Sequence, residues 1–448
     1  MIPPKPASRE GDVSLRRYVR LFREDILSAQ PARLYRAWMA EFRTPFFRSF
    51  LVNQPELVRR VLRESPRDFP KSTRVSEGLR PLLGNSVFLT NGAVWERQRR
   101  IIDPAFEGGR LRETYPAMWA ASEAMVARLS PGRLEVEEMA SFAAADVIFR
   151  TLFSLPIEDE IAARVFQEFR AYQRTQPVVN VAAFVPLPRW MPRLFRRRTR
   201  ASAKAIRALI GTLCARRMAE IEAGTAPDDL ATKIMTTEDP ETGERFSTAE
   251  MVDQVAIFFL AGHETSASAL GWALYLLATH PDWQERVAVE AREALKTGDF
   301  AEVSDLRIAR DVFREALRLY PPVPMMVREA SCPHRFRDRA VPRGSQIVLS
   351  PWHLHRHERL WDNPDGFDPA RWTTENGKTC QRDAFIPFSA GPRVCTGAGF
   401  AMVEGPLLLA QAVRAYRFEP TDEVPAPVAH LTVRAKDGIW LKARPRSG

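Results

Sequence analysis

A cysteine lies next to a predicted helix start in residues 388–397, which read FSAGPRVCTG. The Gly-Pro pair predicts a turn, and a helix is expected from about 396 to 415. Backbone amides and the positive dipole end at a helix start lower a thiol's pKa and stabilise the thiolate. A thiolate can serve as an axial ligand of haem iron, where it favours cleavage of the O–O bond. Cys395 is therefore a candidate iron ligand, the alternative being a buried inert cysteine beside a turn.

A second reactive group is the run from Ala261 to Thr265, AGHET, within a long apolar helix pattern. Ala261 and Gly262 are small, and a glycine lets a flat ligand approach the helix backbone. Glu264 and Thr265 supply an acid and an alcohol, which together can pass protons to reacting dioxygen. The alternative is a helix kink in which Thr265 bonds a backbone carbonyl and Glu264 is solvated.

The helix that carries this run is expected from Ser247 to about Thr279, before His280-Pro281. Ser247 and Glu250 form a capping box, and thirty-odd residues at ~1.5 Å each span nearly 50 Å. Because the helix is apolar almost all round, it should pass through the centre of the molecule. Other helices are expected at about 93–106, 112–129, 138–154, 158–174 and 193–223, and strand-like runs at 48–58, 345–352, 430–436 and 439–444. This order predicts one mainly α domain with minor β structure.

Composition narrows the range of partners. The 448 residues carry 65 Lys and Arg against 55 Asp and Glu, a net charge of +10, which is consistent with an acidic partner or an anionic membrane. No zinc-finger or aromatic RNA-binding signature is present, so no nucleic-acid partner is expected. The four cysteines lie far apart without a CxxC pair, which argues against a disulfide framework or a zinc site. The N-terminus, rich in proline and charge, predicts a cytoplasmic protein without a membrane span.

The cysteine segment resembles the haem-binding signature of the cytochrome P450 family, FxxGxRxCxG. Its fixed positions are filled by Phe388, Gly391, Arg393, Cys395 and Gly397. The resemblance covers about residues 35–445 and implies a single-domain cytochrome P450 fold, with haem b between the long central helix and the cysteine loop. It divides the chain into an N-terminal arm, 1–34, and one haem domain, 35–448, without a fused reductase. Departures from the usual pattern, such as Val394, concern the subgroup.

The resemblance also assigns roles to residues outside the cysteine loop. Trp95 and Arg99 match WxxxR, one helical turn apart, and arginine binds carboxylates through a forked donor pair. Arg99, Arg393 and Arg328 are the candidates for holding the two haem propionates, with Trp95 donating its indole N–H. The family's ExxR pair and its third member stabilise the underside of the haem pocket, and here these are Glu315, Arg318 and Arg371.

The activity that the resemblance implies is monooxygenation of an apolar small molecule, with O2 as co-substrate. AGHET and the cysteine loop look most like the fatty-acid and terpenoid-hydroxylating branches, and substrate contacts are expected near 74–89, 170–190, 258–261 and 323–327. Electrons from NAD(P)H would arrive through a ferredoxin or flavodoxin and its reductase, docked on a basic patch that includes Arg97 and Arg100. The apolar, proline-rich and basic stretch 177–198 either touches a membrane surface or packs as a flap. A peroxygenase, an isomerase and a haem sensor are the alternatives.

Overall fold

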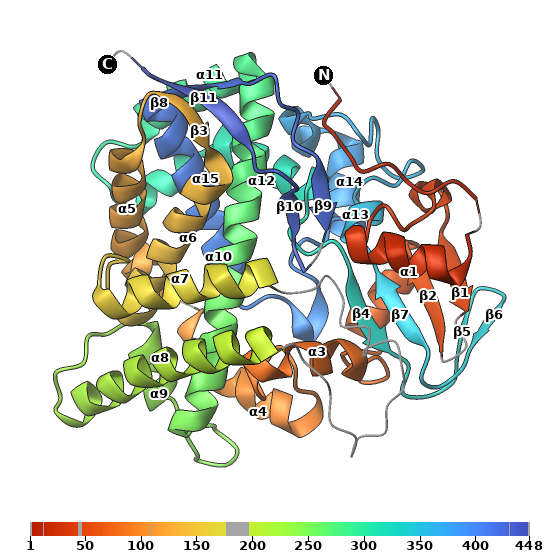
Figure 1. Cartoon of the computed structure of the whole chain (residues 1–448), viewed down its shortest axis with the longest axis horizontal. Coiled ribbons are helices and arrows are strands. Elements are labelled where there is room, and N and C mark those ends of the chain that lie inside the picture. Colours follow the sequence, from red (N-terminus) through yellow and green to blue (C-terminus); the bar gives the residue numbers. More distant parts are fainter. Residues whose placement is uncertain are drawn as a thin grey trace.

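The computed structural model describes residues 2–446 apart from 12, 44–46, 108, 176–196 and 430. Most helices lie on one side of the molecule and the largest sheet lies on the other (Figure 1). The α-helices are α1 Leu15–Glu24, α2 Pro55–Arg59, α3 Thr73–Leu83, α4 Gly92–Ile102, α5 Arg110–Arg128, α6 Val136–Phe153, α7 Glu160–Thr175, α8 Arg197–Glu222, α9 Leu230–Thr236, α10 Thr248–Thr279, α11 Pro281–Ala294, α12 Arg307–Leu319, α13 Pro351–Leu354, α14 Glu375–Asp383 and α15 Ala398–Ala415. The strands are β1 Met39–Arg43, β2 Arg48–Val52, β3 Gly132–Glu135, β4 Met326–Glu329, β5 His334–Phe336, β6 Arg339–Val341, β7 Gln346–Leu349, β8 Tyr416–Pro420, β9 Pro427–Ala429, β10 Val433–Ala435 and β11 Trp440–Pro445.

Helix α10 is the axis of the helical half. Its N-terminus has the predicted capping box, in which the Ser247 hydroxyl and the Glu250 carboxylate each accept a backbone N–H. The helix packs against α6, α8, α12 and α15, and nearly all of its residues from 251 to 278 are buried. An apolar surface on every side explains this position, because a helix without a polar face must be enclosed by other elements.

The largest sheet has the strand order β1-β2-β7-β4. Strand β2 pairs in parallel with β7 from Ser49 opposite Gln346 to Val52 opposite Leu349, while β4 pairs with β7 in the antiparallel sense. A second sheet, β3-β11-β8, joins the end of the chain to the helical half. Both sheets connect segments that are far apart in the sequence, so they hold the cysteine loop and the central helix in one body.

The predicted helices and strands are present, with ends that differ by a few residues. The 93–106 prediction corresponds to α4 and a following 3-10 turn, and 48–58 divides into β2 and α2, which begins at Pro55. In the described part of the chain, no helix combines the length and apolarity that a bilayer crossing requires. The predicted membrane-contact stretch lies almost wholly outside the described residues, since only the backbone of Arg197 and Arg198 is included.

Candidate functional site

The cysteine loop is folded by its own backbone and by a close contact with another segment. The Cys395 N–H donates to the Phe388 carbonyl at 2.9 Å, which closes the loop. Gly391 has φ of +70°, and a Cβ there would lie 2.0 Å from the Leu62 carbonyl oxygen. Only glycine fits both conditions. The loop is thus fixed against the turn that contains Leu62, and the cysteine takes a defined position just before α15.

The electrostatics of Cys395 differ from the sequence-based expectation. The Gly397 N–H bonds the sulfur and the Arg99 charge is close, and both lower the pKa of the thiol as predicted. The larger influence is desolvation by the protein atoms packed around the sulfur, and the net effect raises the pKa of Cys395 above its usual value. The residue as a whole is nevertheless exposed at the surface. The helix start therefore does not by itself bring the pKa of this thiol below its usual range, whereas coordination to a metal would remove the proton.

One stripe of α10 is left uncovered by the surrounding helices. Between residues 251 and 278, Ala261 is the one exposed position in the described structure, and Phe258, Gly262 and Thr265 are partly exposed. Phe258, Ala261 and Thr265 follow one another at helical spacings of three and four, so they lie on one face, with Gly262 beside them. A ligand that lies along this face would therefore contact mainly apolar side chains, with the Thr265 hydroxyl at one end.

Gly262 and the following residue, His263, also have structural contacts. A Cβ on Gly262 would lie 2.6 Å from the Ile148 side chain, so this glycine accommodates α6. The expectation that Gly262 serves ligand approach is therefore only part of its role. His263 points away from the exposed stripe, with its Nε2 2.6 Å from the Ser141 hydroxyl, and burial lowers its pKa to about 3. His263 is thus neutral at physiological pH.

Glu264 and Thr265 lie side by side in sequence but have different partners. The Thr265 hydroxyl donates to the Ala261 carbonyl at 2.5 Å, which is the back-bonded arrangement considered as the alternative. Glu264 is buried instead of solvated: its Oε1 accepts from the Thr432 hydroxyl at 2.7 Å and pairs with Arg434 at 2.9 Å. The acid of the predicted pair is therefore attached to the C-terminal hairpin, β9-β10.

Several cations gather beside the cysteine loop. Burial holds the pKa of Lys71 well below its ordinary value. The positive charges of Arg393, Arg328 and Arg99 lower it further. Arg328 is 7% exposed, and burial together with Arg393 lowers its pKa to about 10. The Arg393 guanidinium lies 4.3 Å from the Trp95 ring centre, and its buried Nη1 has no hydrogen-bond partner among the described residues. Such buried like charges are costly unless an anion joins them.

Arg99 belongs to this group but already has other contacts. Its Nη1 donates to the Val394 carbonyl at 2.8 Å, and its Nε pairs with Asp103 at 2.9 Å. Arg99 therefore links α4 to the cysteine loop directly, which the sequence pattern does not reveal. Arg328 and Arg393 have more free donors for an anionic ligand.

The predicted three-residue set on α12 is assembled as expected. The Arg318 Nη2 lies 2.7 Å from Glu315 Oε1, and Arg371 Nε lies 3.2 Å from the same oxygen. Arg318 also donates to the carbonyls of His355, Pro364 and Gly366, and Arg371 to those of Asp362 and Asn363. All three members are buried. The set therefore ties the segment 355–371, which has little regular structure, to helix α12.

The comparison with protein families decides the identity of the chain. A family model described as Cytochrome P450 matches residues 40–442. The chain belongs to the cytochrome P450 family. Cyclooctat-9-en-7-ol 5-monooxygenase from Streptomyces melanosporofaciens is 33% identical over 85% of this P450 and 83% of its own length. Cytochrome P450 4F12 from Homo sapiens is 28% identical over 94% and 84%. The crystal structure of the cytochrome P450DA heme domain matches with a TM-score of 0.81 and 24% identity, covering 100% of this chain and 99% of that one.

Membership makes this P450 an oxidoreductase and implies a haem cofactor, and the site residues fit that group. Haem requires a metal ligand, apolar walls and partners for its two carboxylates. Cys395 supplies a thiol that already accepts an N–H, the α10 stripe supplies an apolar wall, and the buried Arg393 Nη1 has no hydrogen-bond partner among the described residues. The orphaned Arg393 Nη1 is the clearest indication, because such a group normally has a partner.

Sequence patterns missed three residues of this P450 site. Lys71 precedes α3 and belongs to no motif, although its ammonium group lies near the Trp95 ring. Thr432 and Arg434 are almost 170 residues from Glu264. No local signal could have found the last two, because only the tertiary fold brings the C-terminal hairpin onto α10.

Proposed function

We propose that this P450 is a haem-thiolate monooxygenase that inserts one oxygen atom from O2 into a hydrophobic organic substrate such as a fatty acid or terpenoid. The observation that carries the proposal is the cluster of the three cations Lys71, Arg328 and Arg393 beside the cysteine loop, in which the buried Arg393 Nη1 has no hydrogen-bond partner among the described residues. Two carboxylates would neutralise these buried charges, and the adjacent thiol would bind the metal of the same cofactor. The family match independently supports a monooxygenase.

In this proposal Cys395 would bind the iron of haem b through its thiolate, with Phe388 and Gly391 holding its loop. Arg328, Arg393 and Arg99 orient the propionates together with Lys71, and Trp95 positions the Arg393 guanidinium. Ala261 and Gly262 form the opposite wall. When bound, haem supplies the activation of O2, one atom of which enters the substrate while the other becomes water with two electrons and two protons. The protein residues hold the reactants and deliver the protons.

Replacing Arg328 by methionine should weaken haem binding. A charge-assisted hydrogen bond contributes about 1.5–3 kcal/mol, so the haem affinity should fall roughly 10- to 100-fold. The rate of haem transfer to an acceptor protein measures this change. Arg335→Met is the control, since that arginine is exposed on β5. Equal transfer rates for Arg328→Met and the unmodified protein would remove Arg328 from the propionate site.

Thr265 and Glu264 are proposed to serve proton delivery, although by unequal routes. The Thr265 hydroxyl donates a hydrogen bond to the Ala261 carbonyl, which leaves its oxygen free to accept a further hydrogen bond. Glu264 is buried, and its carboxylate is held by Thr432 and Arg434. Thr265 is therefore the member that contacts reacting groups, and Glu264 is a positioning residue behind it.

Removing the Thr265 hydroxyl tests this assignment. In Thr265→Ala, we expect product formation to fall by about 10²-fold, the lower range for loss of a proton-transfer group. NAD(P)H consumption should continue, with the electrons leaving as hydrogen peroxide. Thr265→Ser keeps the hydroxyl and should restore the ratio of product to NAD(P)H. An unchanged ratio in the alanine variant would show that proton delivery does not use Thr265.

The substrate is proposed to be apolar because the accessible positions are apolar. Phe258 and Ala261 lie on the open stripe of α10, and residues 323–327 before and in β4 are partly exposed except Pro324. Much of the predicted 170–190 contact region is outside the described residues. The relative named for a cyclooctat-9-en-7-ol acts on an alkenol, and that name favours substrates with a largely hydrocarbon body. A screen of fatty acids and terpenoid alcohols, read by the haem spin-state change on binding, would identify the class.

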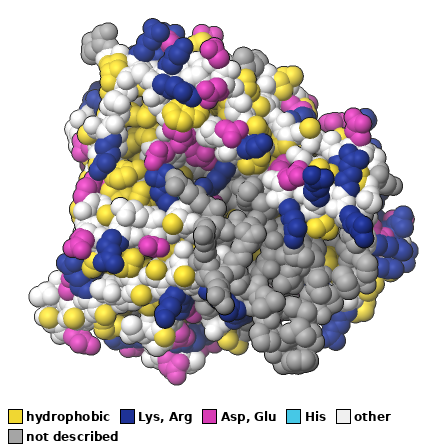
Figure 2. All heavy atoms as spheres, viewed as in Figure 1, with side chains coloured by type: hydrophobic (Ala, Val, Ile, Leu, Met, Phe, Trp, Pro, Cys, Tyr) yellow, Lys and Arg dark blue, Asp and Glu magenta, His cyan; other side chains and the backbone are white. Residues whose placement is uncertain are grey.

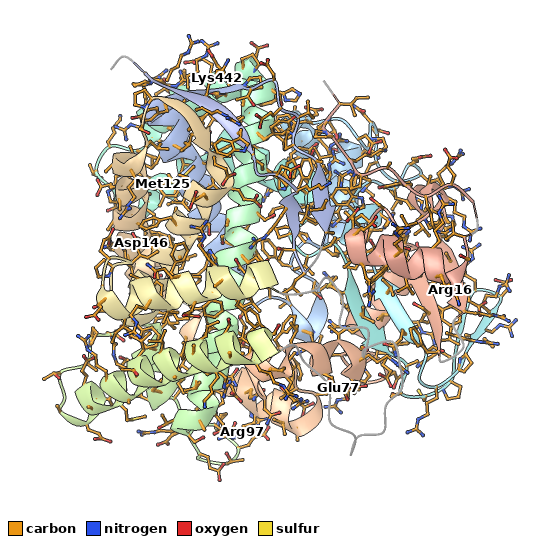
Figure 3. All side chains as sticks on the ribbon, in the orientation of Figure 1. Arg16, Glu77, Arg97, Met125, Asp146 and Lys442 are labelled. Atoms are coloured by element: carbon orange, nitrogen blue, oxygen red, sulfur yellow. The ribbon has the colours of Figure 1, made fainter. Side chains whose placement is uncertain are left out.

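Electrons are proposed to come from NAD(P)H through a ferredoxin or flavodoxin and its reductase. The predicted docking residues are less available than expected: Arg97 pairs with Glu250 at 2.8 Å near the start of α10 (Figure 3), and Arg100 pairs with Asp239 at 2.5 Å. On the face drawn in Figure 2, acidic and basic side chains are interspersed over much of the surface. Other basic residues must therefore dominate any charge steering.

The described cysteines are free, which supports a cytoplasmic location.

A further inference from the structure

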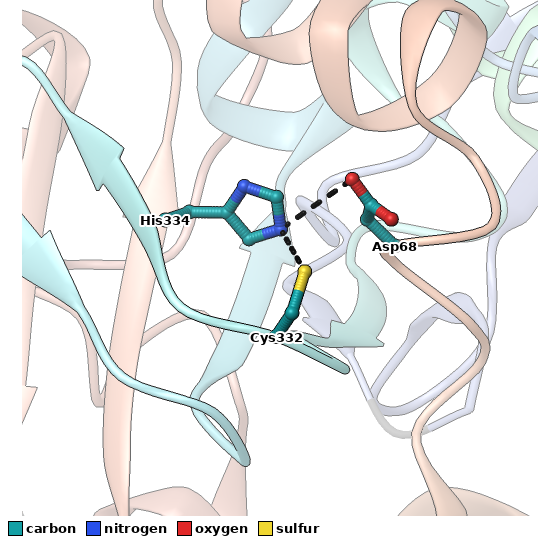
Figure 4. A group of neighbouring side chains, drawn as sticks. All are labelled: Asp68, Cys332 and His334. Carbon is teal, nitrogen blue, oxygen red and sulfur yellow. Dashed lines mark hydrogen bonds and ion pairs between the residues drawn. The ribbon is translucent and has the colours of Figure 1, made fainter.

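A thiol, an imidazole and a carboxylate converge at the edge of the β-rich half, away from the cysteine loop. The Cys332 sulfur lies 3.3 Å from the His334 Nε2, and the Asp68 Oδ2 lies 3.8 Å from the same nitrogen (Figure 4). All three ligand atoms lie within 4.8 Å of one another, and no other group of three such side chains meets that limit in the described structure. The haem site proposed above uses none of these residues.

The geometry excludes one catalytic interpretation of these side chains. In a Cys-His-Asp triad, the carboxylate must hold one ring nitrogen while the other faces the thiol. Here the sulfur and the carboxylate oxygen approach the same Nε2, as both contacts in Figure 4 show. Three donor atoms that face a common point are arranged as ligands around an ion. Tetrahedral zinc, with Zn–S of about 2.3 Å and Zn–N and Zn–O of about 2.0–2.2 Å, needs donors separated by distances of this size.

The protein around the group fixes the donors before any ion binds. The His334 ring stacks on Phe69 with ring centres 4.4 Å apart, and its side chain is 7% exposed. The Asp68 carbonyl accepts from the Ser331 N–H at 2.8 Å and from its hydroxyl at 3.0 Å, which holds the two segments together. The Asp68 side chain is 44% exposed and leaves an approach from solvent. Little ordering is therefore needed on binding.

Although the wide spacing of the cysteines argued against a zinc site, we propose that Cys332, His334 and Asp68 form a binding site for a borderline-soft divalent cation, with Zn²⁺ the best match. Thiolate and imidazole select this class of ion over Mg²⁺ or Ca²⁺, which prefer oxygen ligands. On binding, the Cys332 S–H bond breaks, a sulfur–zinc bond forms and the proton passes to the buffer. Three protein ligands leave a fourth position for water. The ion would join the loop before Lys71 to the segment after β4.

The same two segments continue toward the cation group beside the cysteine loop. The Glu329 N–H donates to the Pro70 carbonyl at 2.9 Å, and the backbones of Lys71 and Arg328 form an isolated antiparallel β-bridge. Zinc would therefore hold one end of a paired strip whose other end carries Lys71 and Arg328. We expect the ion to raise the thermal midpoint of the holoenzyme, because it binds the folded state.

Metal uptake by chelator-treated holoenzyme tests the site. Equilibrium dialysis against Zn²⁺, followed by metal analysis, should show one bound equivalent that Cys332→Ala and His334→Ala weaken by at least roughly 10- to 100-fold. Asp68→Asn should weaken it less, because that side chain is the most exposed. Cys380→Ala is the matched control, since Cys380 is buried and bonds the Leu360 carbonyl. Equal zinc affinity in Cys332→Ala and Cys380→Ala would overturn the proposal.

Alkylation of the unmodified holoenzyme provides a test that needs no variant. Cys332 is partly exposed while Cys214 and Cys380 are buried, so an alkylating reagent should modify Cys332 in preference to them. Zn²⁺ should slow that modification at least 10-fold, as mapped on peptides by mass spectrometry, and Mg²⁺ should not. Zinc uptake without protection of Cys332 would place the ion elsewhere. Neither readout depends on turnover, so the proposed oxygenase function can fail independently.

Discussion

Cys395→Ser protein should lose substrate oxidation to the background level of the assay. Serine keeps the loop hydrogen bond from residue 395 to the Phe388 carbonyl, since that contact uses the backbone N–H. It removes the soft, electron-donating sulfur that favours O–O cleavage at haem iron. The reduced protein with CO should also lose the long-wavelength absorption band that is typical of thiolate-ligated haem. Spectra and turnover with a redox partner measure the two effects.

The matched control for this change is Cys380→Ser. Cys380 is buried on α14 and bonds the Leu360 carbonyl, so its replacement tests the loss of a thiol away from the site. We expect this variant to keep both the CO spectrum and the activity. A Cys395→Ser protein with an unchanged spectrum and undiminished oxidation would contradict the assignment of the axial ligand and, with it, the proposed chemistry.

The second large effect is expected on stability. Glu315→Ala leaves the guanidinium groups of Arg318 and Arg371 buried without their shared carboxylate. Breaking a buried ion pair in this way costs about 3–5 kcal/mol, a large part of a typical total of about 5–15 kcal/mol. We expect a lower denaturation midpoint and poor recovery of folded holoenzyme. Chemical denaturation followed by helical circular dichroism and by haem absorbance measures the free energy of unfolding.

An exposed ion pair on α14 is the control for that measurement. Glu375 and Lys378 lie at i and i+3 on α14, with their charged groups 2.9 Å apart and the Glu375 side chain 91% exposed. Glu375→Ala should leave the denaturation midpoint nearly unchanged, because solvent screens such pairs. If Glu315→Ala were as mild as this control, the set around α12 would not stabilise the segment 355–371.

The sequence predicted the parts of this P450 whose signals are local. The capping box at Ser247 and Glu250 marked the start of α10, and the apolar surface on all sides predicted its burial. The i, i+3 spacing of Glu315 and Arg318 placed both on one face of α12, and the family pattern supplied Arg371 as the third member. Helical periodicity and short-range capping depend on neighbouring residues, which explains why these predictions are confirmed.

Features that depend on distant contacts could not be predicted. The contact of Gly262 with Ile148 of α6 had no signal in the sequence. The helix start was expected to depress the pKa of Cys395, but burial by surrounding elements outweighs it. Arg97 and Arg100 were predicted to lie in a docking patch, but each pairs with an acidic side chain from a distant part of the sequence. Each difference arises because packing brings together groups that are remote in the sequence.

The attachment of the C-terminal hairpin to α10 makes the hairpin a useful place for a spectroscopic reporter. The Ser268 hydroxyl donates to the Val433 carbonyl at 2.5 Å, and Thr432 and Arg434 bond Glu264 on the same helix. A fluorine label introduced beside these residues would sense changes in the contact between the hairpin and Glu264. Its nuclear magnetic resonance signal could then follow that contact during turnover without any modification of Thr265.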